Sequence, residues 1–120
     1  MDEVKISVGG MDEFFQGALE MARRLDRGAR TPHPAEIMFA DPEALFRLLT
    51  QNRWLLLRSL RKLGPSSIRA LSKALGRDYR GVHADVVALL EAGLVTKDEN
   101  GKVLVPWSKI TAEMDFEAAA

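Results

Sequence analysis

The sequence lacks cysteine altogether, and it has little histidine and no long apolar run. With zero cysteines in 120 residues, disulfides and thiolate metal sites are excluded. The only two histidines, His33 and His83, are too few and too far apart to predict a zinc site. No window approaches about 18 consecutive apolar residues, the length that predicts a membrane-spanning helix. The sequence also contains no nucleotide-binding loop, nucleophile elbow or paired-acid constellation, so we expect no catalytic residues, no cofactor and no enzymatic activity.

What is present has the composition of an ordinary globular protein, with 47% hydrophobic and 28% charged residues. The first residues, MDEVKIS, are acidic and do not have the basic and then apolar pattern of a secretory signal. We therefore expect a cytoplasmic protein without a membrane partner.

The formal net charge is zero, but the charges are unevenly distributed along the chain. Residues 51–84 carry eight basic residues against the single acid Asp78, a net of +7, and the rest of the chain balances them with a net of −7. Such a segment can simply keep helix surfaces solvated, or it can form a face that binds nucleic acid. The second reading is favoured because the same segment contains a pair of closely spaced helices.

The first 49 residues predict a strand, a helix, a strand and a second helix. Residues 4–8 alternate apolar and polar types, and residues 35–40 form a second short strand that we expect to pair with them. Between the strands, Phe15, Leu19, Ala22 and Leu25 recur at helical spacing, and the glycine and prolines of 28–34 indicate a loop. Asp41 is the expected cap of the second helix. We interpret residues 1–49 as an extension and a candidate dimerisation surface.

A third helix is expected over residues 51–63, with Thr50 as its cap. The basic residues of this helix fall largely on its remaining surface. Its expected buried side chains are Trp54, Leu55, Leu57, Leu60 and Leu63.

Residues 67–75 and 79–92 predict two helices joined by a tight turn, the spacing of a helix-turn-helix. Gly76 suits a left-handed helix end, and Asp78 can cap the helix that follows. In this arrangement the second helix places its outer side in the DNA major groove. The buried side of that helix would contain Val82, Val86 and Leu89, which leaves as base-reading candidates Tyr79, Arg80, His83 and Val87.

The first helix of the pair and the turn supply candidates for contacts to DNA phosphates, namely Ser67, Arg69, Lys73 and Arg77. Asp85 is a poor neighbour for a phosphate, and we expect it to be turned aside or paired with a cation. Gly81 is costly inside a helix, by about 1 kcal/mol relative to alanine. Two explanations stay open for this glycine: close approach of the backbone to DNA, or close packing against another helix.

A hairpin follows the helix pair, with strands expected within 94–97 and 102–107 around an Asn-Gly turn. A hairpin directly after the second helix corresponds to the wing of a winged helix. Lys97, Asn100 and Lys102 are the wing candidates for DNA contact, whereas Asp98 and Glu99 weaken the expectation of tight contact there. The predicted fold is therefore α+β and mainly helical, a winged helix-turn-helix over 50–107 with the N-terminal extension before it.

The segments LTQNRWLLLRSL, SSIRALSKALGRDYRGVHADVVALLEAGLV and ENGKVLVPWSKI together carry a family resemblance. Over roughly residues 35–112 the chain resembles small prokaryotic winged-helix transcriptional regulators and antitoxin-like DNA-binding proteins, and more distantly the MarR and ArsR groups. The resemblance implies sequence-specific binding of double-stranded DNA, usually by a homodimer, often with repression of an operon that includes a toxin gene. It implies recognition-helix contacts by Arg77, Tyr79, Arg80 and His83. The metal-sensing cysteines of the ArsR group are absent, so metal responsiveness is not implied.

Residues 108–120 are expected to form a terminal strand over 110–116 and a frayed tail. With the N-terminal strand and helix, this segment could form the dimer surface or cover the domain's own core. The leading hypothesis is a dimeric repressor that binds DNA, with autoregulation as an antitoxin as one form of it. The alternative is a protein-interaction module that neutralises a partner such as a toxin without binding DNA.

Overall fold

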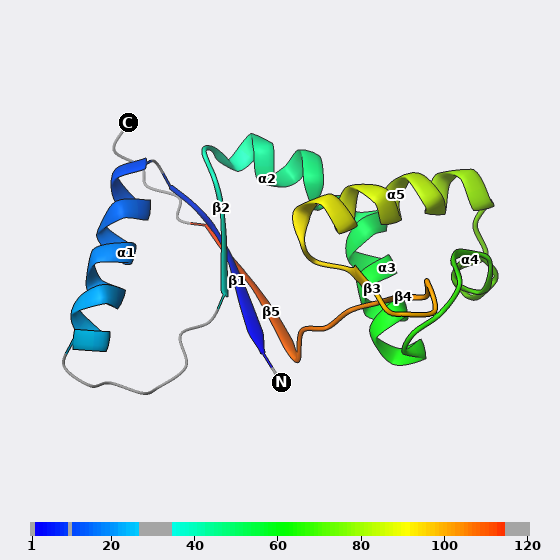
Figure 1. Cartoon of the computed structure of the whole chain (residues 1–120). Coiled ribbons are helices and arrows are strands. Elements are labelled where there is room, and N and C mark those ends of the chain that lie inside the picture. The colour runs from blue at the N-terminus through cyan, green and yellow to red at the C-terminus, as the bar shows by residue number, and fades with distance from the viewer. Residues whose placement is uncertain (1, 10, 27–34, 115–120) are drawn as a thin grey trace. The chain divides into compact units, whose positions relative to one another are not determined.

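The computed structural model describes residues 2–9, 11–26 and 35–114, and these residues form an α+β structure with five helices and two small sheets (Figure 1). The chain divides into two units, one drawn from Met1–Leu45 and Ser108–Ala120 and the other from Phe46–Trp107. The boundary between the units therefore falls after Leu45, within a helix and four residues before the boundary expected after residue 49. The expected loop 28–34, with His33, and the tail 115–120 lie outside the described residues.

The first unit is built on a three-stranded parallel sheet with the strand order β2-β1-β5. Its strands are β1 (Glu3–Val8), β2 (Ala35–Phe39) and β5 (Lys109–Glu113). Helix α1 (Met11–Asp26) lies between β1 and β2 in the sequence, and α2 (Pro42–Leu48) follows β2, capped by Asp41 through the Ala44 amide. The predicted pairing of the first two strands is confirmed, and the C-terminal strand pairs along the other edge of β1.

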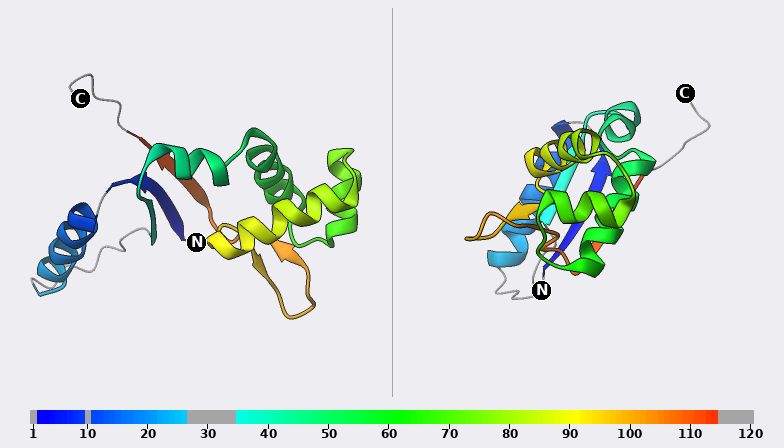
Figure 2. Two further views of the ribbon diagram at one scale, coloured as in Figure 1. Left: turned by 90° about the horizontal axis from the view of Figure 1, so that it is seen from above. Right: turned by 90° about the vertical axis from the view of Figure 1, so that its right-hand side faces the viewer.

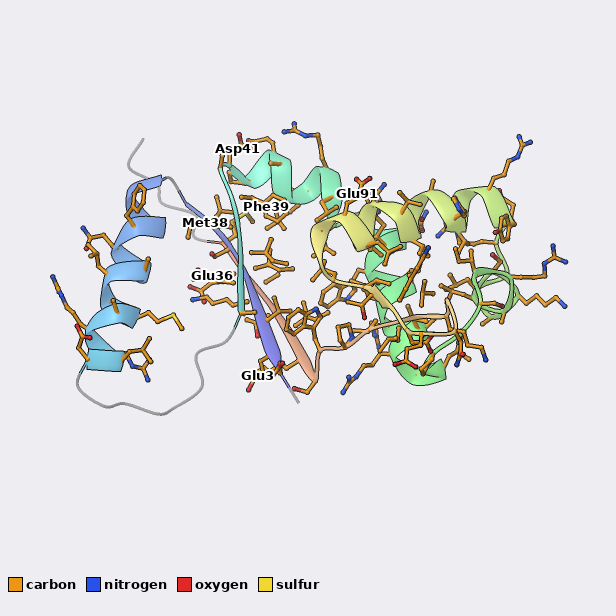
Figure 3. The ribbon with its side chains drawn as sticks, in the orientation of Figure 1. Glu3, Glu36, Met38, Phe39, Asp41 and Glu91 are labelled. Carbon is orange, nitrogen blue, oxygen red and sulfur yellow. The ribbon has the colours of Figure 1, made fainter. Side chains whose placement is uncertain are left out.

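The two faces of this sheet differ in chemistry. Alternation along parallel strands places Val4 and Ile6 on one face, where both are buried. On the other face Lys5 Nζ lies 3.4 Å from Glu113 Oε2, and Ser7 Oγ donates to Glu36 Oε1 at 3.0 Å. Figure 3 shows the same alternation on β2, where Glu36 and Met38 project to one side and Phe39 to the other.

The second unit contains α3 (Gln51–Leu63), α4 (Ile68–Leu75) and α5 (Tyr79–Ala92). Each begins after a capping residue: the side chains of Thr50, Ser67 and Asp78 accept hydrogen bonds from backbone amides three residues ahead, and Thr50 and Asp78 are the caps expected from the sequence. The core of this unit lies between the helices and the chain that follows them. Its fully buried side chains are Leu56, Leu60, Leu71, Val82, Val86, Leu89, Leu94, Val95 and Val103.

A short hairpin follows α5, made of β3 (Thr96–Lys97) and β4 (Val103–Leu104) in antiparallel pairing. Ser66, between α3 and α4, exchanges two backbone hydrogen bonds with Val103 at 3.0 and 2.9 Å. This bridge attaches the hairpin to the helices, and the hairpin loop projects beside α5 (Figure 2).

The expected buried side of α3 is partly wrong. Trp54, Leu55 and Leu63 are 37%, 43% and 49% exposed, whereas Leu56, which was not expected in the core, is fully buried with Leu60. Apolar residues occur on most sides of this helix, and only one side can face α4 and α5. The periodicity therefore identified the helix but not the direction in which it faces.

None of the helices in the described part of the chain combines the length and the apolar character needed to cross a bilayer.

Candidate functional site

The two helices α4 and α5 are joined by a turn of three residues in which each residue has a defined role. Gly76 has φ 66° and ψ 32°, the left-handed conformation that glycine adopts without steric cost. The Arg77 amide donates to the Ser72 carbonyl at 3.1 Å, and the Asp78 carboxylate accepts from the Gly81 amide at 3.0 Å. The three residues of the turn therefore end α4 and cap α5.

Helix α5 has one side in the core and one side in solvent. Val82, Val86 and Leu89 are fully buried, as their spacing predicts. On the opposite side the four base-reading candidates Tyr79, Arg80, His83 and Val87 are all exposed. The Tyr79 and His83 rings, one helical turn apart, lie with centroids 5.8 Å apart and planes tilted by 33°. The structure thus gathers two aromatic rings, a guanidinium and an aliphatic side chain on one accessible surface.

Helix α4 contributes two exposed cations to the same pair of helices, Arg69 and Lys73, while its Leu71 is buried. Ser67 is also exposed, and its Oγ accepts from the Ala70 amide at 3.0 Å. An oxygen that accepts a hydrogen bond in a cap still has its own hydroxyl proton to donate. All three side chains are therefore able to reach an anion in solvent.

Arg77 is placed differently from the other phosphate candidates. Its Nη2 lies 2.8 Å from Asp85 Oδ2, and the other carboxylate oxygen, Oδ1, accepts from Arg53 Nε at 2.9 Å. The three side chains are only 26%, 14% and 21% exposed, in the order Arg77, Asp85 and Arg53. Arg77 is thus held in an ion pair and not displayed to solvent, and the expected cation partner of Asp85 is in fact two guanidinium groups.

Sequence reasoning did not identify Arg53 as part of this cluster. Arg53 also donates from Nη1 to the Leu48 carbonyl at 2.9 Å and to the Arg47 carbonyl at 3.3 Å, and so connects the end of α2 to α5. The available signal was the position of Asp85 itself, an acid directly after a strongly basic segment. Because the Asp85 charge is surrounded by two cations, it does not oppose an anion at the outer side of α5.

The same cluster explains Gly81. A Cβ atom at this position would lie 3.2 Å from Asp78 Oδ1 and 3.3 Å from Arg77 Nη2, closer than most Cβ contacts. The glycine therefore leaves room for the capping carboxylate and for the guanidinium that reaches past it. Neither of the two explanations considered from the sequence is needed, since the space beside Gly81 is taken by side chains of the turn.

At the tip of the hairpin, Asp98 organises the turn. Its Oδ1 accepts from the amides of Asn100 and Lys102, each at 2.9 Å, and Gly101 has φ 78°. The Asp98 carboxylate therefore accepts hydrogen bonds from the backbone of its own turn. The three wing candidates Lys97, Asn100 and Lys102 are exposed around it.

The chain leaves the second unit at Trp107, whose Nε1 donates to the Gly93 carbonyl at 3.0 Å, while its own carbonyl accepts from Arg61 Nη1. Among the described residues, no group of three or more histidine and acidic side chains could hold a metal ion.

No curated protein and no solved structure shows significant similarity to this chain. One family model matches it, that of the HVO_A0114 family, over residues 48–112. The matched segment contains α3, α4, α5, the hairpin and most of β5. Because the match covers more than half of the chain, the protein belongs to the HVO_A0114 family.

Proposed function

We propose that this protein is a transcriptional regulator that binds double-stranded DNA in a sequence-specific way, with Phe46–Trp107 serving as a winged helix. The order of α3, α4, α5 and hairpin supports this reading, as does the bridge from Ser66 to Val103. The observation that carries the proposal is the outer side of α5. Groups able to contact bases are exposed there, and the nearby acid Asp85 is neutralised by two guanidinium groups.

The side chains on α5 have the chemistry needed to read base edges. Arg80 can donate two hydrogen bonds to O6 and N7 of a guanine in the major groove. His83 and Tyr79 can donate to base edges or to phosphates, and the Val87 methyl groups can contact the methyl group of thymine. Sequence choice would therefore come from about two turns of one helix.

Contacts to phosphates would come from α4 and from the hairpin. Arg69, Lys73 and the Ser67 hydroxyl are exposed on α4, and Lys97 and Lys102 are exposed on the hairpin. Such contacts position a protein on the duplex and supply affinity without reading sequence. Arg77 is assigned a different role here, that of holding the turn through Asp85. A regulator bound in this way represses by occupying its operator.

The test is selection of bound duplexes from a random pool, followed by titration of the selected duplex at rising salt. Each phosphate neutralised by a cation lowers log K by about 0.9 per unit of log salt concentration. Four cations, from α4 and the hairpin, predict a slope of about −3 to −4 for each bound chain. Enrichment of a common motif together with this slope supports the proposal.

A chain that enriches no motif and shows no salt-sensitive affinity for duplex DNA contradicts the proposal. Such a chain would instead fit the protein-interaction module considered from the sequence. The matched control in these titrations is Arg58→Ala, which removes one exposed cation from α3 and should leave the affinity for the selected duplex within about twofold, as for a surface change outside the interface.

A further inference from the structure

Strand β5 is an edge strand of the three-stranded sheet. Strand β1 pairs along one of its sides, and no strand in the described part of the chain pairs along the other. An edge of this kind presents backbone N–H and C=O groups that can pair with a strand of another molecule. Because Lys109, Thr111, Ala112 and Glu113 are all exposed, the described residues leave most of this strand accessible.

The charges of β5 are placed symmetrically about its middle residue. Lys109 and Glu113 are the two ends of the strand, each two residues from Thr111. The Glu113 side chain is 55% exposed even with Lys5 Nζ at 3.4 Å, so it can still meet a second cation. If two copies of β5 run antiparallel with Thr111 at the centre, each Lys109 lies opposite a Glu113. If they run parallel in register, like charges lie side by side.

The two faces of the sheet select the same arrangement. The strand register places Ile110 beside Val4 and Ala112 beside Ile6, on the apolar face, and the other three residues of β5 on the polar face. In an antiparallel pair centred on Thr111, Ile110 of one copy lies opposite Ala112 of the other, so each face continues across the pair. A shift by one residue would place apolar side chains opposite charged ones.

The other edge strand of the sheet, β2, has no such symmetry. In an antiparallel pair centred on Ile37, Glu36 would lie opposite Met38, and no opposite charges would meet. A charged side chain without a partner across an edge discourages pairing. Of the two edges, that of β5 is therefore the one suited to a second copy of the same strand.

We propose that β5 pairs with β5 of a second copy of this chain, antiparallel and centred on Thr111, so that two three-stranded sheets join into one. Such a pair uses the same surface on both copies and closes after two. Its two pairs of Lys109 with Glu113 and its central pair of threonines are of the kinds that stabilise neighbouring strands. None of the side chains proposed to contact DNA belongs to β5, so this proposal and the proposed function can fail independently.

The first test exchanges the charges in the full chain and measures self-association by sedimentation equilibrium. Lys109→Glu and Glu113→Lys should each weaken the dimer at least about tenfold, because both cross-strand pairs then join like charges. A mixture of the two variants should restore the dimer, since each pair again joins opposite charges. The matched control Glu36→Lys makes the same change on the polar face of β2, and the Kd should stay within about threefold.

Three outcomes of this test overturn the proposal. One is a wild-type chain that stays monomeric at concentrations up to about 1 mM. Another is a mixture that associates no better than its two separate variants, because the charges at these positions then do not meet across the pair. The third is an equal effect of Glu113→Lys and Glu36→Lys.

The second test determines the orientation, and the absence of native cysteine makes it unambiguous. In the antiparallel pair the Cα atoms of the two Thr111 residues lie about 4.5–5.5 Å apart, whereas the two copies of Met114 are six residues, about 20 Å, apart along the strands. Disulfides require Cα atoms within about 7 Å. With diamide as oxidant, Thr111→Cys should form a covalent dimer and Met114→Cys should not. Cross-linking at both positions indicates parallel strands, and cross-linking at neither indicates another surface; both results contradict the proposal.

Discussion

Replacing Asp85 by alanine tests whether the cluster of Arg53, Asp85 and Arg77 holds the second unit together. The substitution removes one aligned hydrogen bond of 2.9 Å to Arg53 and one ion contact of 2.8 Å to Arg77. It leaves two guanidinium groups about three-quarters buried next to each other. Breaking a fully buried pair costs about 3–5 kcal/mol, and an exposed pair contributes about 1 kcal/mol or less.

The structure places the cost between these limits. The two arginines can be partly hydrated, and Arg53 keeps its contacts to the Arg47 and Leu48 carbonyls. We therefore expect Asp85→Ala to lower the free energy of unfolding by about 2 kcal/mol. Arg77→Ala should cost less, about 1 kcal/mol, because Asp85 then retains Arg53 as its partner.

Urea unfolding followed by tryptophan fluorescence measures this change directly, because both tryptophans, Trp54 and Trp107, lie in Phe46–Trp107. With an m-value of about 1 kcal/mol/M for a unit of this size, the midpoint should fall by about 2 M. Glu91→Ala is the control, since it removes an exposed acid from the same helix and should change stability by less than about 0.5 kcal/mol. If Asp85→Ala and Glu91→Ala have the same effect, the cluster does not stabilise this unit.

Three further substitutions test local features of the second unit by chemical unfolding. Asp98→Ala should destabilise it by about 1–2 kcal/mol because two backbone amides lose their acceptor; no measurable change would mean that the turn forms without the carboxylate. Trp107→Phe, with unfolding monitored by circular dichroism, should lower the free energy of unfolding by about 1 kcal/mol because the Gly93 carbonyl loses its donor. A variant as stable as the wild type, or more stable, would contradict this. Gly81→Ala should change the free energy of unfolding by less than about 0.5 kcal/mol, because the gain in helix propensity is offset by crowding against Asp78 and Arg77. A gain of about 1 kcal/mol would show that these two side chains move away without cost.

The sequence predicted the elements of this protein better than it predicted their faces. Caps and glycines are local signals, so Thr50, Asp78 and Gly76 were identified from neighbouring residues alone. The burial of Leu56 and the exposure of Trp54 depend on where α4 and α5 lie against α3, and that information is not local. Periodicity cannot choose a direction for a helix with apolar residues on most of its sides.

The candidate site shows the same difference between what local signals predict and what depends on packing. The outward direction of Tyr79, Arg80 and His83 follows from the buried spacing of Val82, Val86 and Leu89, and the structure agrees with it. The position of Arg77 could not be predicted in this way. Its partner Asp85 lies on the following helix and also binds Arg53, so the pairing depends on three segments that meet only in the folded chain.

The measurement that tests the central proposal most directly compares Arg80→Ala with Lys73→Ala on two duplexes, one selected from a random pool and one with the selected motif scrambled. If Arg80 reads a base, its loss should weaken binding of the selected duplex by about 1–3 kcal/mol and leave the scrambled duplex nearly unaffected. Loss of Lys73, a phosphate contact, should weaken both duplexes equally and reduce the salt slope by about one. Unchanged affinity of Arg80→Ala for the selected duplex, or equal losses on both duplexes, would contradict the assignment of sequence reading to the outer side of α5.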